Sequence, residues 1–527
     1  MLTNTFLEEE YILNTPLEHR QKYAQFFTPF EIAEIMSQWI LGHKYLKCVL
    51  DPSFGLGIFA RTLYKYRDDI SITGYEVDKF ILSKSEIYFN NLKNLNIHNK
   101  DYIFNDWDSK YDAIVGNPPY FKFHDYDNKN NIKKISKKIS MELSGFTNLY
   151  SLFLLKSIYQ LNDQGRLAYI VPSEFLNSDY GVKIKDYLVK SKTLRYIIVV
   201  DFTENVFNDT LTTACILLCA KDDNYEKVGF LNISSLEDLD EIKSIVNCYP
   251  NADAENTVTY FNLKQLEPAK KWRRFYQKQN ATYYKNLVPF SKFAKASRGI
   301  ATGANDFFVF NQSKAEQHCI GEEYLLPCVC KSKDITNPFF TDNLFNNLKE
   351  NNKDVFLLNA KEPLNYDVIK YLDYGIQQGI NEKHLTSKRN PWYSIEKRSP
   401  APIWFSVFNR TGIKIIFNET NTSHLTTFHG IYPLYTCDIA LLSAYFLTNM
   451  SKQILEDNQR EYGNGLKKFE PNDINNGLVI DFDLIDYKTQ KSIIYLFHNY
   501  RQSVIADKPD KYIINEIEDI FSGIFSL

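Results

Sequence analysis

Short apolar runs alternate with amphipathic stretches over roughly the first 220 residues of the chain. The apolar runs predict strands at residues 48–50, 70–75, 102–104, 111–116, 167–171, 195–201 and 213–220. Between them, apolar side chains recur at helical spacing, for example at Ile32, Ile35, Met36, Trp39 and Ile40. Strands that alternate with helices predict a mostly parallel, doubly wound α/β sheet, and the last two runs are close enough to pair as an antiparallel hairpin.

Local signals mark where several of these elements begin and end. Thr28 can cap the helix that starts near residue 30, Pro29 suits its first position, and Glu31 stands where a capping-box acid belongs. Residues 125–140 are polar and rich in Lys and Asn, which predicts a mobile surface loop. Polar residues also follow the carboxyl ends of the predicted strands, where sheets of this kind bind their ligands.

The alternation of strands and helices fades after about residue 225, where the periodicity becomes mixed. A chain of 527 residues is too long for one hydrophobic core, so about two to four domains are expected. We place a boundary between residues 225 and 285 and assign residues 1–235 to the α/β domain. Residues 236–527 are then expected to form a second, mixed α/β domain that ends in a helical segment.

Composition narrows the class of protein. With 44% hydrophobic and 24% charged residues the chain is typical of soluble globular proteins, and a net charge of −3 excludes a uniformly basic nucleic-acid binder. The amino-terminal residues resemble no secretory signal, and the apolar runs are too short to span a bilayer. Eight scattered cysteines, several of them in apolar runs, predict buried thiols in a reducing cytoplasm. His318–Cys319 and Cys328–Cys330 fit no common zinc spacing, so no metal site is expected.

The segment Asn117–Pro118–Pro119–Tyr120 follows the apolar run 111–116 and carries the most informative chemistry of the chain. Two prolines remove two backbone donors and fix two φ angles, so the carbonyl groups around them are rigid and free to accept hydrogen bonds. An amide side chain before them and an aromatic ring after them complete a polar pocket with a flat wall. The segment suits a planar exocyclic amine, and the alternative is an ordinary proline-rich turn.

A glycine-rich segment upstream indicates a nucleotide-like ligand. The Gly55-x-Gly57 pattern, with Glu76 about 20 residues on to hold a ribose diol, fits the dinucleotide fingerprint, so a nicotinamide enzyme is one alternative. However, Asp51 before the glycines would repel a pyrophosphate, whereas it can meet an ammonium through a water or a backbone amide. With Asp106 as acceptor for an adenine amino group, the better fit has an amino-acid end, a ribose and an adenine. That ligand is S-adenosylmethionine.

These motifs occur in the order used by the N6-adenine DNA methyltransferases of the gamma class. The resemblance covers about residues 20–220 and is carried by residues 25–29 (Gln-Phe-Phe-Thr-Pro), 51–57 (Asp-Pro-Ser-Phe-Gly-Leu-Gly), 76, 106 and 117–120. A looser similarity extends to residues 297–303 and 460–466. The chain resembles the TaqI-type branch, which implies a Rossmann-like S-adenosylmethionine-dependent core followed by a C-terminal target-recognition domain for double-stranded DNA.

The resemblance implies a role for each matching residue. The cofactor-binding residues are expected to be Thr28 and Pro29 at the methionine end, Asp51, Ser53, Gly55 and Gly57 close by, Glu76 at the ribose, Val77, Asp106 and Trp107 at the adenine, and Asn117. The catalytic turn is expected to comprise Asn117, Pro118, Pro119 and Tyr120. Phe207 is expected as a second aromatic wall for the target base, with a core position in the hairpin as the alternative.

An adenine N6 amine is a poor nucleophile, because its lone pair is conjugated into the ring. Acceptors at both N–H groups favour a more tetrahedral nitrogen, and the Asn117 side-chain carbonyl and the Pro118 backbone carbonyl can supply them. The target base must first leave the duplex, and stacking on Tyr120 and Phe207 would compensate at about 1–3 kcal/mol per base. Asn at the first motif position implies, by the resemblance, adenine N6 rather than cytosine N4.

Basic and aromatic residues interleave at several places in the second half of the sequence. Such stretches can neutralise phosphates and position a duplex, while a solvated helix face remains the alternative for any single cluster. The expected DNA-binding residues are Lys270, Lys271, Arg273, Arg274, Arg298, Lys388, Arg389, Arg398 and Arg410.

The expected function is a site-specific DNA adenine methyltransferase that protects host DNA in a restriction-modification system, beside a separately encoded endonuclease. We expect a monomer in the cytoplasm of a bacterium or archaeon, associated with the nucleoid through its DNA and not with a membrane. Three alternatives stay open: a protein glutamine methyltransferase, an RNA adenine methyltransferase, and a noncatalytic DNA-binding specificity subunit with a vestigial cofactor fold.

Overall fold

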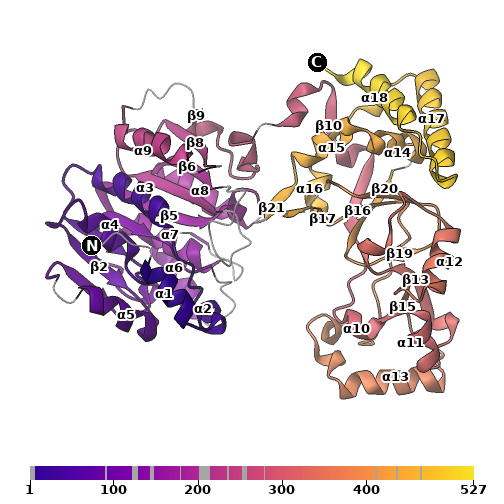
Figure 1. Ribbon diagram of the computed structural model, residues 1–527, viewed down its shortest axis with the longest axis horizontal. Helices are drawn as coiled ribbons and strands as arrows, with labels where there is room; N and C mark the ends of the chain where they lie inside the picture. The colour runs from indigo at the N-terminus through magenta and orange to yellow at the C-terminus, as the bar shows by residue number, and fades with distance from the viewer. Residues whose placement is uncertain are drawn as a thin grey trace. The chain divides into compact units, whose positions relative to one another are not determined.

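The computed structural model describes residues 6–89, 92–120, 129–139, 141–142, 148–178, 180–200, 214–233, 235, 237–251, 258–277, 279–409, 412–434, 437–462 and 466–527. The chain divides into two compact units (Figure 1). The first comprises Met1–Lys278 with Glu461–Gly465, and the second comprises Gln279–Arg460 with Leu466–Leu527.

A nine-stranded sheet forms the centre of the first unit, in the order β3-β2-β1-β4-β5-β7-β6-β8-β9 (Figure 1). Its strands are β1 (Cys48–Asp51), β2 (Ser71–Tyr75), β3 (Leu95–His98), β4 (Tyr111–Gly116), β5 (Leu161–Pro172), β6 (Leu194–Val200), β7 (Ala214–Ala220), β8 (Lys227–Ile233) and β9 (Thr259–Asn262). The pairs from β3 to β5 are parallel, while β7 runs antiparallel between β5 and β6. This topology confirms the predicted α/β fold, including the antiparallel pairing of the last two predicted strands.

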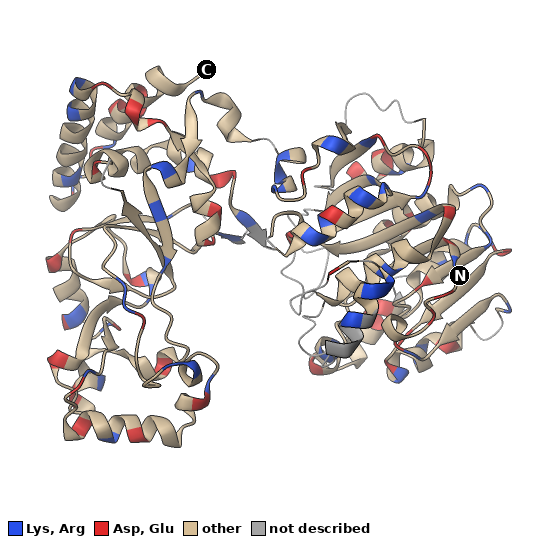
Figure 2. Cartoon of the chain, turned by 180° about the vertical axis from the view of Figure 1, so that it is seen from behind, with Lys and Arg blue, Asp and Glu red and all other residues tan. Residues whose placement is uncertain are grey.

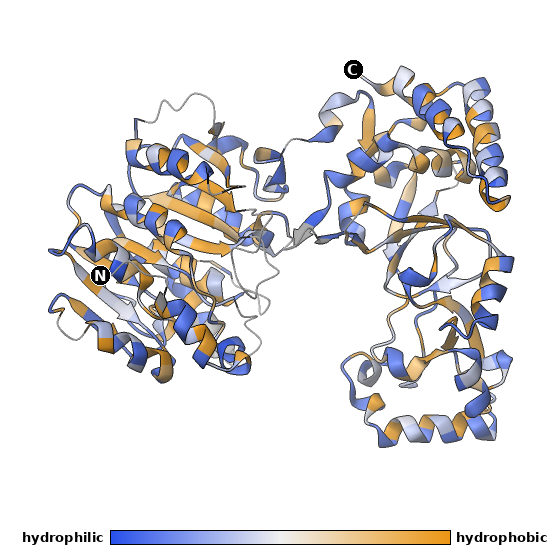
Figure 3. Cartoon of the chain, in the orientation of Figure 1, coloured by the Kyte–Doolittle hydropathy of each residue, from blue (hydrophilic) through white to orange (hydrophobic). Residues whose placement is uncertain are grey.

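Helices cover both faces of this sheet. One core cluster joins the sheet to α3 (Phe30–Leu41), α4 (Ile58–Tyr64) and α9 (Asp238–Cys248), and another joins it to α6 (Lys129–Lys138), α7 (Leu149–Gln160) and α8 (Gly181–Ser191). The remaining helices of this unit are α1 (Phe6–Asn14), α2 (Leu17–Lys22) and α5 (Lys79–Phe89). Because both faces are covered, the central strands are almost continuously apolar, whereas the helices alternate apolar and polar residues (Figure 3).

The third strand differs from the sequence-based prediction. Residues 102–104 form a 3-10 turn, η1 (Tyr102–Phe104), and the third strand is β3, earlier in the chain. β3 lies at the edge of the sheet, where its residues are only partly buried, so its sequence Leu-Asn-Ile-His lacks a strong apolar signal. The aromatic residues of η1 are more apolar, which explains the wrong assignment.

Two further segments also depart from the sequence-based predictions. Residues 129–138, within the predicted loop 125–140, form α6, because Ile135 and Ile139 anchor this basic helix in the core. Residues 125–128 and 140 lie outside the described residues. The sheet also continues beyond residue 220: β8 pairs in parallel with β6, and β9 pairs antiparallel with β8. The first compact unit therefore extends past residue 235, to Lys278.

The described residues of the second unit form several smaller sheets. Their orders are β11-β20-β16-β18-β14, β12-β15-β13-β19, β10-β23 and β17-β22. The strands are β10 (Leu287–Pro289), β11 (Ala294–Arg298), β12 (Val309–Phe310), β13 (Leu325–Val329), β14 (Phe339–Phe340), β15 (Phe356–Leu358), β16 (Ile403–Ser406), β17 (Phe408–Asn409), β18 (Ile415–Asn418), β19 (Ser423–His424), β20 (Phe428–Pro433), β22 (Leu466–Lys468) and β23 (Leu478–Ile480). β21 (Arg460–Tyr462) belongs mostly to the first unit, which includes residues 461 and 462.

Helices complete the second unit as a mixed α/β structure, as predicted. They are α10 (Asn305–Phe308), α11 (Gln312–Gln317), α12 (Asp342–Glu350), α13 (Tyr366–Gln377), α14 (Ile439–Leu447), α15 (Asn449–Glu456), α16 (Pro471–Asn475), α17 (Tyr487–Ile505) and α18 (Lys511–Phe525). α14, α15, α17 and α18 share one core cluster, which forms the helical segment at the C-terminus. In the described part of the chain, no helix is long and apolar enough to cross a membrane, and no group of three or more His, Cys, Asp or Glu residues is placed to hold a metal ion.

Candidate active site

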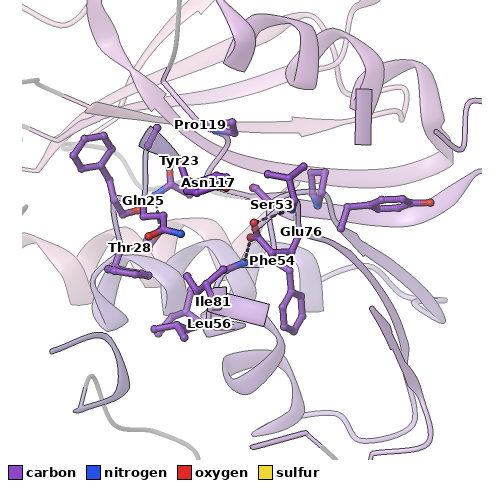
Figure 4. Close-up of a pocket in the computed structure, with 18 of the residues that line it drawn as sticks. Tyr23, Gln25, Thr28, Ser53, Phe54, Leu56, Glu76, Ile81, Asn117 and Pro119 are labelled. Carbon is purple, nitrogen blue, oxygen red and sulfur yellow. Dashed lines mark hydrogen bonds between the residues drawn. The ribbon is translucent and has the colours of Figure 1, made fainter. Parts of the chain in front are cut away.

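The candidate site lies at the carboxyl ends of β1 and β4, which are neighbours in the central sheet. β1 pairs in parallel with β2 on one side and with β4 on the other, so the strand order reverses between β1 and β4. Open α/β sheets bind their ligands at such a switch point. A pocket at this edge is lined by the segment 23–28, by the turn after β1, by the end of β2 and by Asn117 and Pro119. In Figure 4, Gln25, Thr28 and Asn117 lie on one side of the pocket and Ser53 and Glu76 on the other.

The turn between β1 and α4 depends on two glycines in the left-handed conformation. Gly55 has a φ of +52° and Gly57 a φ of +74°, values at which a side chain would be strained. A Cβ atom at Gly57 would also lie 2.6 Å from the Phe89 ring. The glycines let the backbone run close to the pocket and start α4 at Ile58, as in a nucleotide-binding turn.

Glu76 holds this turn from the end of β2. Its Oε2 accepts the Gly55 amide at 2.9 Å, and its Oε1 accepts the amides of Val77 and Asp78 at 2.9 Å each. Burial raises the pKa of the Glu76 carboxyl, and the three backbone donors oppose that shift. Because a carboxylate can accept about four hydrogen bonds, Glu76 keeps capacity for a ribose hydroxyl, and this role stays a prediction.

Asp51 lies behind the pocket wall and does not line the pocket. Its side chain is fully buried, and its Oδ1 accepts the Ser53 amide at 3.2 Å. Burial raises the pKa of the Asp51 carboxyl to about 8, and the Glu76 carboxylate acts in the same direction. Contact between Asp51 and a cofactor ammonium therefore requires an intermediary such as a water or a backbone amide, as the sequence analysis allows.

Asp106 and Trp107 follow η1, at the side of the sheet where the adenine is expected. Asp106 is half-buried with a φ of +50°, and its Oδ2 accepts the Tyr111 hydroxyl at 2.5 Å. Burial favours a higher pKa for Asp106, but hydrogen bonds from Ser109 and Tyr111 outweigh it and lower the pKa of this carboxyl. Val77 lines the pocket, whereas Asp106 and Trp107 do not, so the adenine contacts of these two residues stay predictions.

Lys156 of α7 supports the same turn, and the sequence analysis did not identify it. Its ammonium group donates to the backbone carbonyls of Tyr102 and Asn105 and lies 3.8 Å from the centroid of the Tyr102 ring. The side chain is buried, and burial lowers the pKa of Lys156 to about 7, although the Asp106 carboxylate opposes that shift. Lys156 thus fixes the turn that carries Asp106. The only sign of Lys156 in the sequence is that it is the single lysine within the apolar stretch 149–160.

Two acceptors from the segment before α3 orient the Asn117 side chain. Its Nδ2 donates to the Phe26 carbonyl at 2.9 Å and to Thr28 Oγ1 at 3.1 Å. Since both N–H groups are engaged, the remaining polar atom of the side chain, Oδ1, can only accept. Thr28 does not cap α3, which begins at Phe30 directly after Pro29 with no side-chain cap, so the capping prediction is wrong. The Thr28 hydroxyl instead serves Asn117 in the pocket wall.

Aromatic packing fixes the ring of Tyr120. The ring of Phe26 lies nearly parallel to it, at an interplanar angle of 17° with 6.1 Å between centroids, and Tyr150 of α7 meets it edge-on at 6.2 Å. Phe26 therefore contacts two residues of the catalytic turn, a role that sequence reasoning missed because Phe26 entered only as part of a motif. Phe207 lies outside the described residues, and its place as a second wall stays a prediction.

The basic cluster at residues 270–274 belongs to the first unit, where its one aromatic residue, Trp272, packs into the core. Arg273 is buried, which favours a structural place for this side chain over a surface that meets DNA. Lys270 and Arg274 are exposed and lie 2.8 and 3.8 Å from Glu267 Oε1, and Lys271 is half-buried. The DNA contacts of these residues stay predictions.

Two of the arginines expected at DNA, Arg389 and Arg398, contact the segment 297–302 of the second unit, which contains a third, Arg298. Arg389 donates to the carbonyls of residues 301 and 302 at 2.5 and 2.9 Å. Arg298 and Arg398 share the carboxylate of Glu396, at 2.7 and 2.9 Å, and Arg398 also donates to Ser297 Oγ. The looser motif noted in the sequence is thus held together by residues from a loop about 90–100 residues away.

Lys388 is exposed, and its Nζ lies 2.7 Å from His384 Nε2. Arg410 lies outside the described residues. Basic and acidic residues are interspersed along both units (Figure 2), in line with a net charge of −3. The overall charge distribution therefore does not identify a DNA-binding surface. The DNA contacts expected for the exposed residues are supported only by the position of each residue, and they stay predictions.

The donor and acceptor set of the pocket fits S-adenosylmethionine. Glu8 Oε2 and Ser53 Oγ belong to pocket-lining residues and are buried without a hydrogen-bond partner in the described part of the chain, as is Asp51 Oδ2 behind them. A surplus of acceptors suits a ligand with an ammonium, two ribose hydroxyls and an adenine amino group. A diphosphate would instead face several carboxyl groups at close range, which argues against a dinucleotide.

Two family models match the chain. The model described as N-6 DNA methylase matches residues 9–287, and the model described as the C-terminal domain of the type II methyltransferase M.Eco57I matches residues 270–514. The first of these covers more than half of the 527 residues, including the pocket and the catalytic turn.

Relatives extend over both halves. The type II methyltransferase M.AccI of Acinetobacter calcoaceticus is 52% identical and the alignment covers 100% of this chain and 98% of that protein. The type II methyltransferase M.XamI of Xanthomonas campestris pv. amaranthicola is 22% identical, with 88% and 86% covered. The solved structure of a nuclease-deletion mutant of the Type ISP restriction-modification enzyme LlaGI with a DNA substrate mimic is 13% identical and shares the fold, with a TM-score of 0.53 over 94% of this chain and 58% of that chain. The chain therefore belongs to the type II methyltransferases of the N-6 DNA methylase family, with S-adenosylmethionine as methyl donor.

Proposed function

We propose that this protein transfers a methyl group from S-adenosylmethionine to N6 of an adenine within a specific duplex DNA sequence. The orientation of Asn117 carries the proposal. Phe26 and Thr28 hold both N–H groups of its amide, at 2.9 and 3.1 Å, so Oδ1 meets a substrate only as an acceptor. An exocyclic amine, which has two N–H groups to donate, is the matching substrate group.

The catalytic turn supplies two acceptors for these two N–H groups. Asn117 Oδ1 is one, and the backbone carbonyl of Pro118 is the other, because the following proline cannot donate and has a fixed φ. Accepting both hydrogens favours a tetrahedral nitrogen with a localised lone pair. S-adenosylmethionine supplies an electrophilic sulfonium methyl group when bound. The same two acceptors stabilise the positive charge that develops on the nitrogen, which then loses a proton to solvent.

Both acceptors are positioned before the substrate arrives. Asn117 directly follows β4, whose pairing with β1 and β5 anchors it in the sheet. Asn117 and Thr28 also line the cofactor pocket, so they stand between that pocket and the space for the base. Direct transfer requires the nitrogen and the methyl carbon at about 3–3.5 Å, which such a fixed boundary favours.

Tyr120 offers a flat surface for a base that has left the duplex. Stacking on an aromatic ring stabilises an extruded base by about 1–3 kcal/mol, which offsets part of the cost of unstacking. Phe207 remains the proposed second wall. Asn at the first position of the catalytic turn, together with the N-6 DNA methylase match, supports adenine as the target.

The second unit is proposed to recognise the DNA sequence. Its exposed basic residues, among them Arg298 and Lys388, support contact with phosphates. The relatives named as type II methyltransferases, and one from Escherichia coli named as a type II restriction enzyme and methyltransferase, support a role in restriction-modification. We infer a monomeric, cytoplasmic enzyme at the nucleoid, with a separately encoded endonuclease for the same DNA sequence.

Expression in a bacterial host without DNA methylation tests the proposal. Sequencing of the host genome for modified bases should find N6-methyladenine in one short sequence motif with the wild-type protein, and none with Asn117→Ala. Both proteins must be soluble, with matching circular dichroism spectra. Folded wild-type protein that leaves the genome unmodified would overturn the proposal, as would modification of cytosine alone.

A further inference from the structure

Glu8 is an acidic residue of the cofactor pocket that lies outside every motif of the sequence. It stands in the first turn of α1 and lines the same pocket as Thr28, Gly55 and Asn117. Its side chain is only 7% exposed. A carboxylate this deeply buried is stable only if partners satisfy its oxygens.

Arg61 of α4 satisfies only one oxygen of Glu8. The Nη2 atom of Arg61 forms an ion pair with Glu8 Oε1, and the Arg61 side chain is itself buried. Glu8 Oε2 is equally buried, yet it has no hydrogen-bond partner within the described part of the chain. Burial raises the pKa of the Glu8 carboxyl, and Arg61 opposes that shift. The group is therefore held as an ion-pair partner with one acceptor left over.

The location of Glu8 matches the amino-acid end of the cofactor. Glu76 marks the ribose end of the pocket, and Asn117 marks the place of methyl transfer. The wall that remains includes Glu8 and Ile58 at the start of α4, one turn before Arg61. Asp51 is the other acid near this end, but it is not among the residues that line the pocket.

We propose that Glu8 Oε2 accepts a hydrogen bond from the α-ammonium group of S-adenosylmethionine, so that α1 is part of the cofactor site. The inference rests on the proposed function, because it requires the amino-acid end of the cofactor in this pocket. Arg61 acts as a positioning residue, because its ion pair with Oε1 opposes the effect of burial on the Glu8 carboxyl and orients the other oxygen. Charge-assisted hydrogen bonds of this kind are the stronger ones, and both partners here are charged.

A purely structural tie between α1 and α4 is the competing explanation for Glu8. The two explanations differ in which ligands depend on the carboxylate. S-adenosylhomocysteine and decarboxylated S-adenosylmethionine both carry the ammonium group, whereas 5′-methylthioadenosine lacks the whole amino-acid end. A structural role would affect all three ligands alike, and an ammonium contact would affect only the first two.

Isothermal titration calorimetry of the full-length protein with these three ligands tests the proposal. Glu8→Gln keeps the size of the side chain and an acceptor for Arg61 but removes the charge. We expect it to raise the Kd of S-adenosylhomocysteine and of decarboxylated S-adenosylmethionine about 10-fold to 100-fold, and to leave the Kd of 5′-methylthioadenosine within about twofold. Glu9→Gln, at the exposed neighbouring position of α1, is the matched control and should change none of the three.

Unchanged affinities in Glu8→Gln would overturn the inference, and so would an equal loss for all three ligands, which indicates a distorted pocket. A loss for S-adenosylhomocysteine without one for the decarboxylated ligand would also overturn it, because the carboxylate would then be the group involved. If the wild-type protein binds none of the ligands, the proposed function fails as well, so the two failures can be told apart.

Discussion

Asn117 Nδ2 lies 2.9 Å from the backbone carbonyl oxygen of Phe26, a residue 91 positions earlier in the chain. The ring of the same Phe26 lies nearly parallel to that of Tyr120. Phe26, in the segment before α3, thus contacts the first and the last residue of the catalytic turn. Its backbone carbonyl binds Asn117, and its ring packs on Tyr120. The geometry of the turn is therefore set by the segment that also lines the cofactor pocket.

Thr28→Val should impair methyl transfer more than cofactor binding. The substitution removes one of the two acceptors for Asn117 Nδ2. With one N–H unpaired, the Asn117 amide can rotate, and Oδ1 then no longer points at the substrate amine. An unsatisfied buried donor costs about 1–3 kcal/mol, so we expect kcat to fall about tenfold. The Kd of S-adenosylhomocysteine should change by less than about threefold, measured by calorimetry.

Thr28→Ser retains the hydroxyl and serves as the control for Thr28→Val. It should keep kcat within about twofold of the wild-type value. A loss in Thr28→Ser as large as that in Thr28→Val would contradict this explanation, because serine keeps the hydroxyl that accepts from Asn117.

Phe26→Ala should lower kcat/KM by about 2-fold to 10-fold. The backbone carbonyl that binds Asn117 remains, so the loss measures the contacts of the ring, which packs on Tyr120 and lines the pocket. Aromatic pairs of this kind contribute about 0.5–1.5 kcal/mol. Phe26→Tyr keeps the ring and should restore most of the activity. Steady-state kinetics on the DNA motif found by genome sequencing provide the measurement, and a Phe26→Tyr variant as impaired as Phe26→Ala would contradict the explanation.

Asp51→Asn should change how stability depends on pH in the absence of cofactor. Burial raises the pKa of Asp51 to about 8, so the folded protein keeps a proton that the unfolded chain loses near pH 4. The stability that comes from the neutral acid is complete below about pH 4 and is lost as pH rises towards about 8. Asn resembles the neutral acid, so the variant should match the wild type at about pH 4 and exceed it increasingly as pH rises towards about 8.

Thermal unfolding of wild type and Asp51→Asn between about pH 5 and pH 8 measures this difference. The gap in unfolding free energy should widen with pH by up to about 1.4 kcal/mol per unit. Buried acids that do not interact with Asp51, such as Glu8, titrate in both proteins and cancel in the comparison. A gap that stays constant or narrows with rising pH would show that Asp51 is ionised in the folded protein.

Elements with a strong local signal were predictable from the sequence, and those that depend on tertiary contacts were not. β1, β4 and β5 are covered on both faces, so their apolar runs are nearly continuous and easy to recognise. β3 and β9 are edge strands of the sheet with partly exposed residues, and their sequences lack that signal. α6 is a strongly basic helix held by two isoleucines, which resembles a polar loop when the fold is not known.

The same distinction holds for the site. Gly55, Glu76 and Asn117 lie in short motifs whose spacing is visible in the sequence. Glu8 and Lys156 each lie in a helix outside every motif of the sequence, and their importance arises only where the fold brings them to Arg61 and to the carbonyls of Tyr102 and Asn105. No periodicity or motif could have placed them, because the partners of each are about 50 residues away.

Lys156→Met should weaken cofactor binding with a smaller effect on kcat. Methionine has a similar length but cannot donate to the carbonyls of Tyr102 and Asn105, so the turn that carries Asp106 loosens. The loss of one or two hydrogen bonds from a charged donor predicts a Kd for S-adenosylhomocysteine raised at least about tenfold. Lys190→Met is the control, because Lys190 is exposed and forms an ion pair with Asp186 of the same helix, α8. Comparable losses in both variants would contradict a specific role for Lys156.

Lys388→Gln and Arg389→Gln should affect different properties, although the two residues are adjacent. Lys388 is exposed, so its removal should weaken DNA binding about equally for all sequences and reduce the slope of log K against log salt by about 0.9. Arg389 is half-buried and donates to two backbone carbonyls of the segment 297–302, so its removal should lower the melting temperature of the protein. Fluorescence anisotropy across a salt series and thermal unfolding separate the two effects. An unchanged salt slope in Lys388→Gln would exclude a phosphate contact at Lys388. An unchanged melting temperature in Arg389→Gln would show that its two hydrogen bonds do not stabilise the segment 297–302.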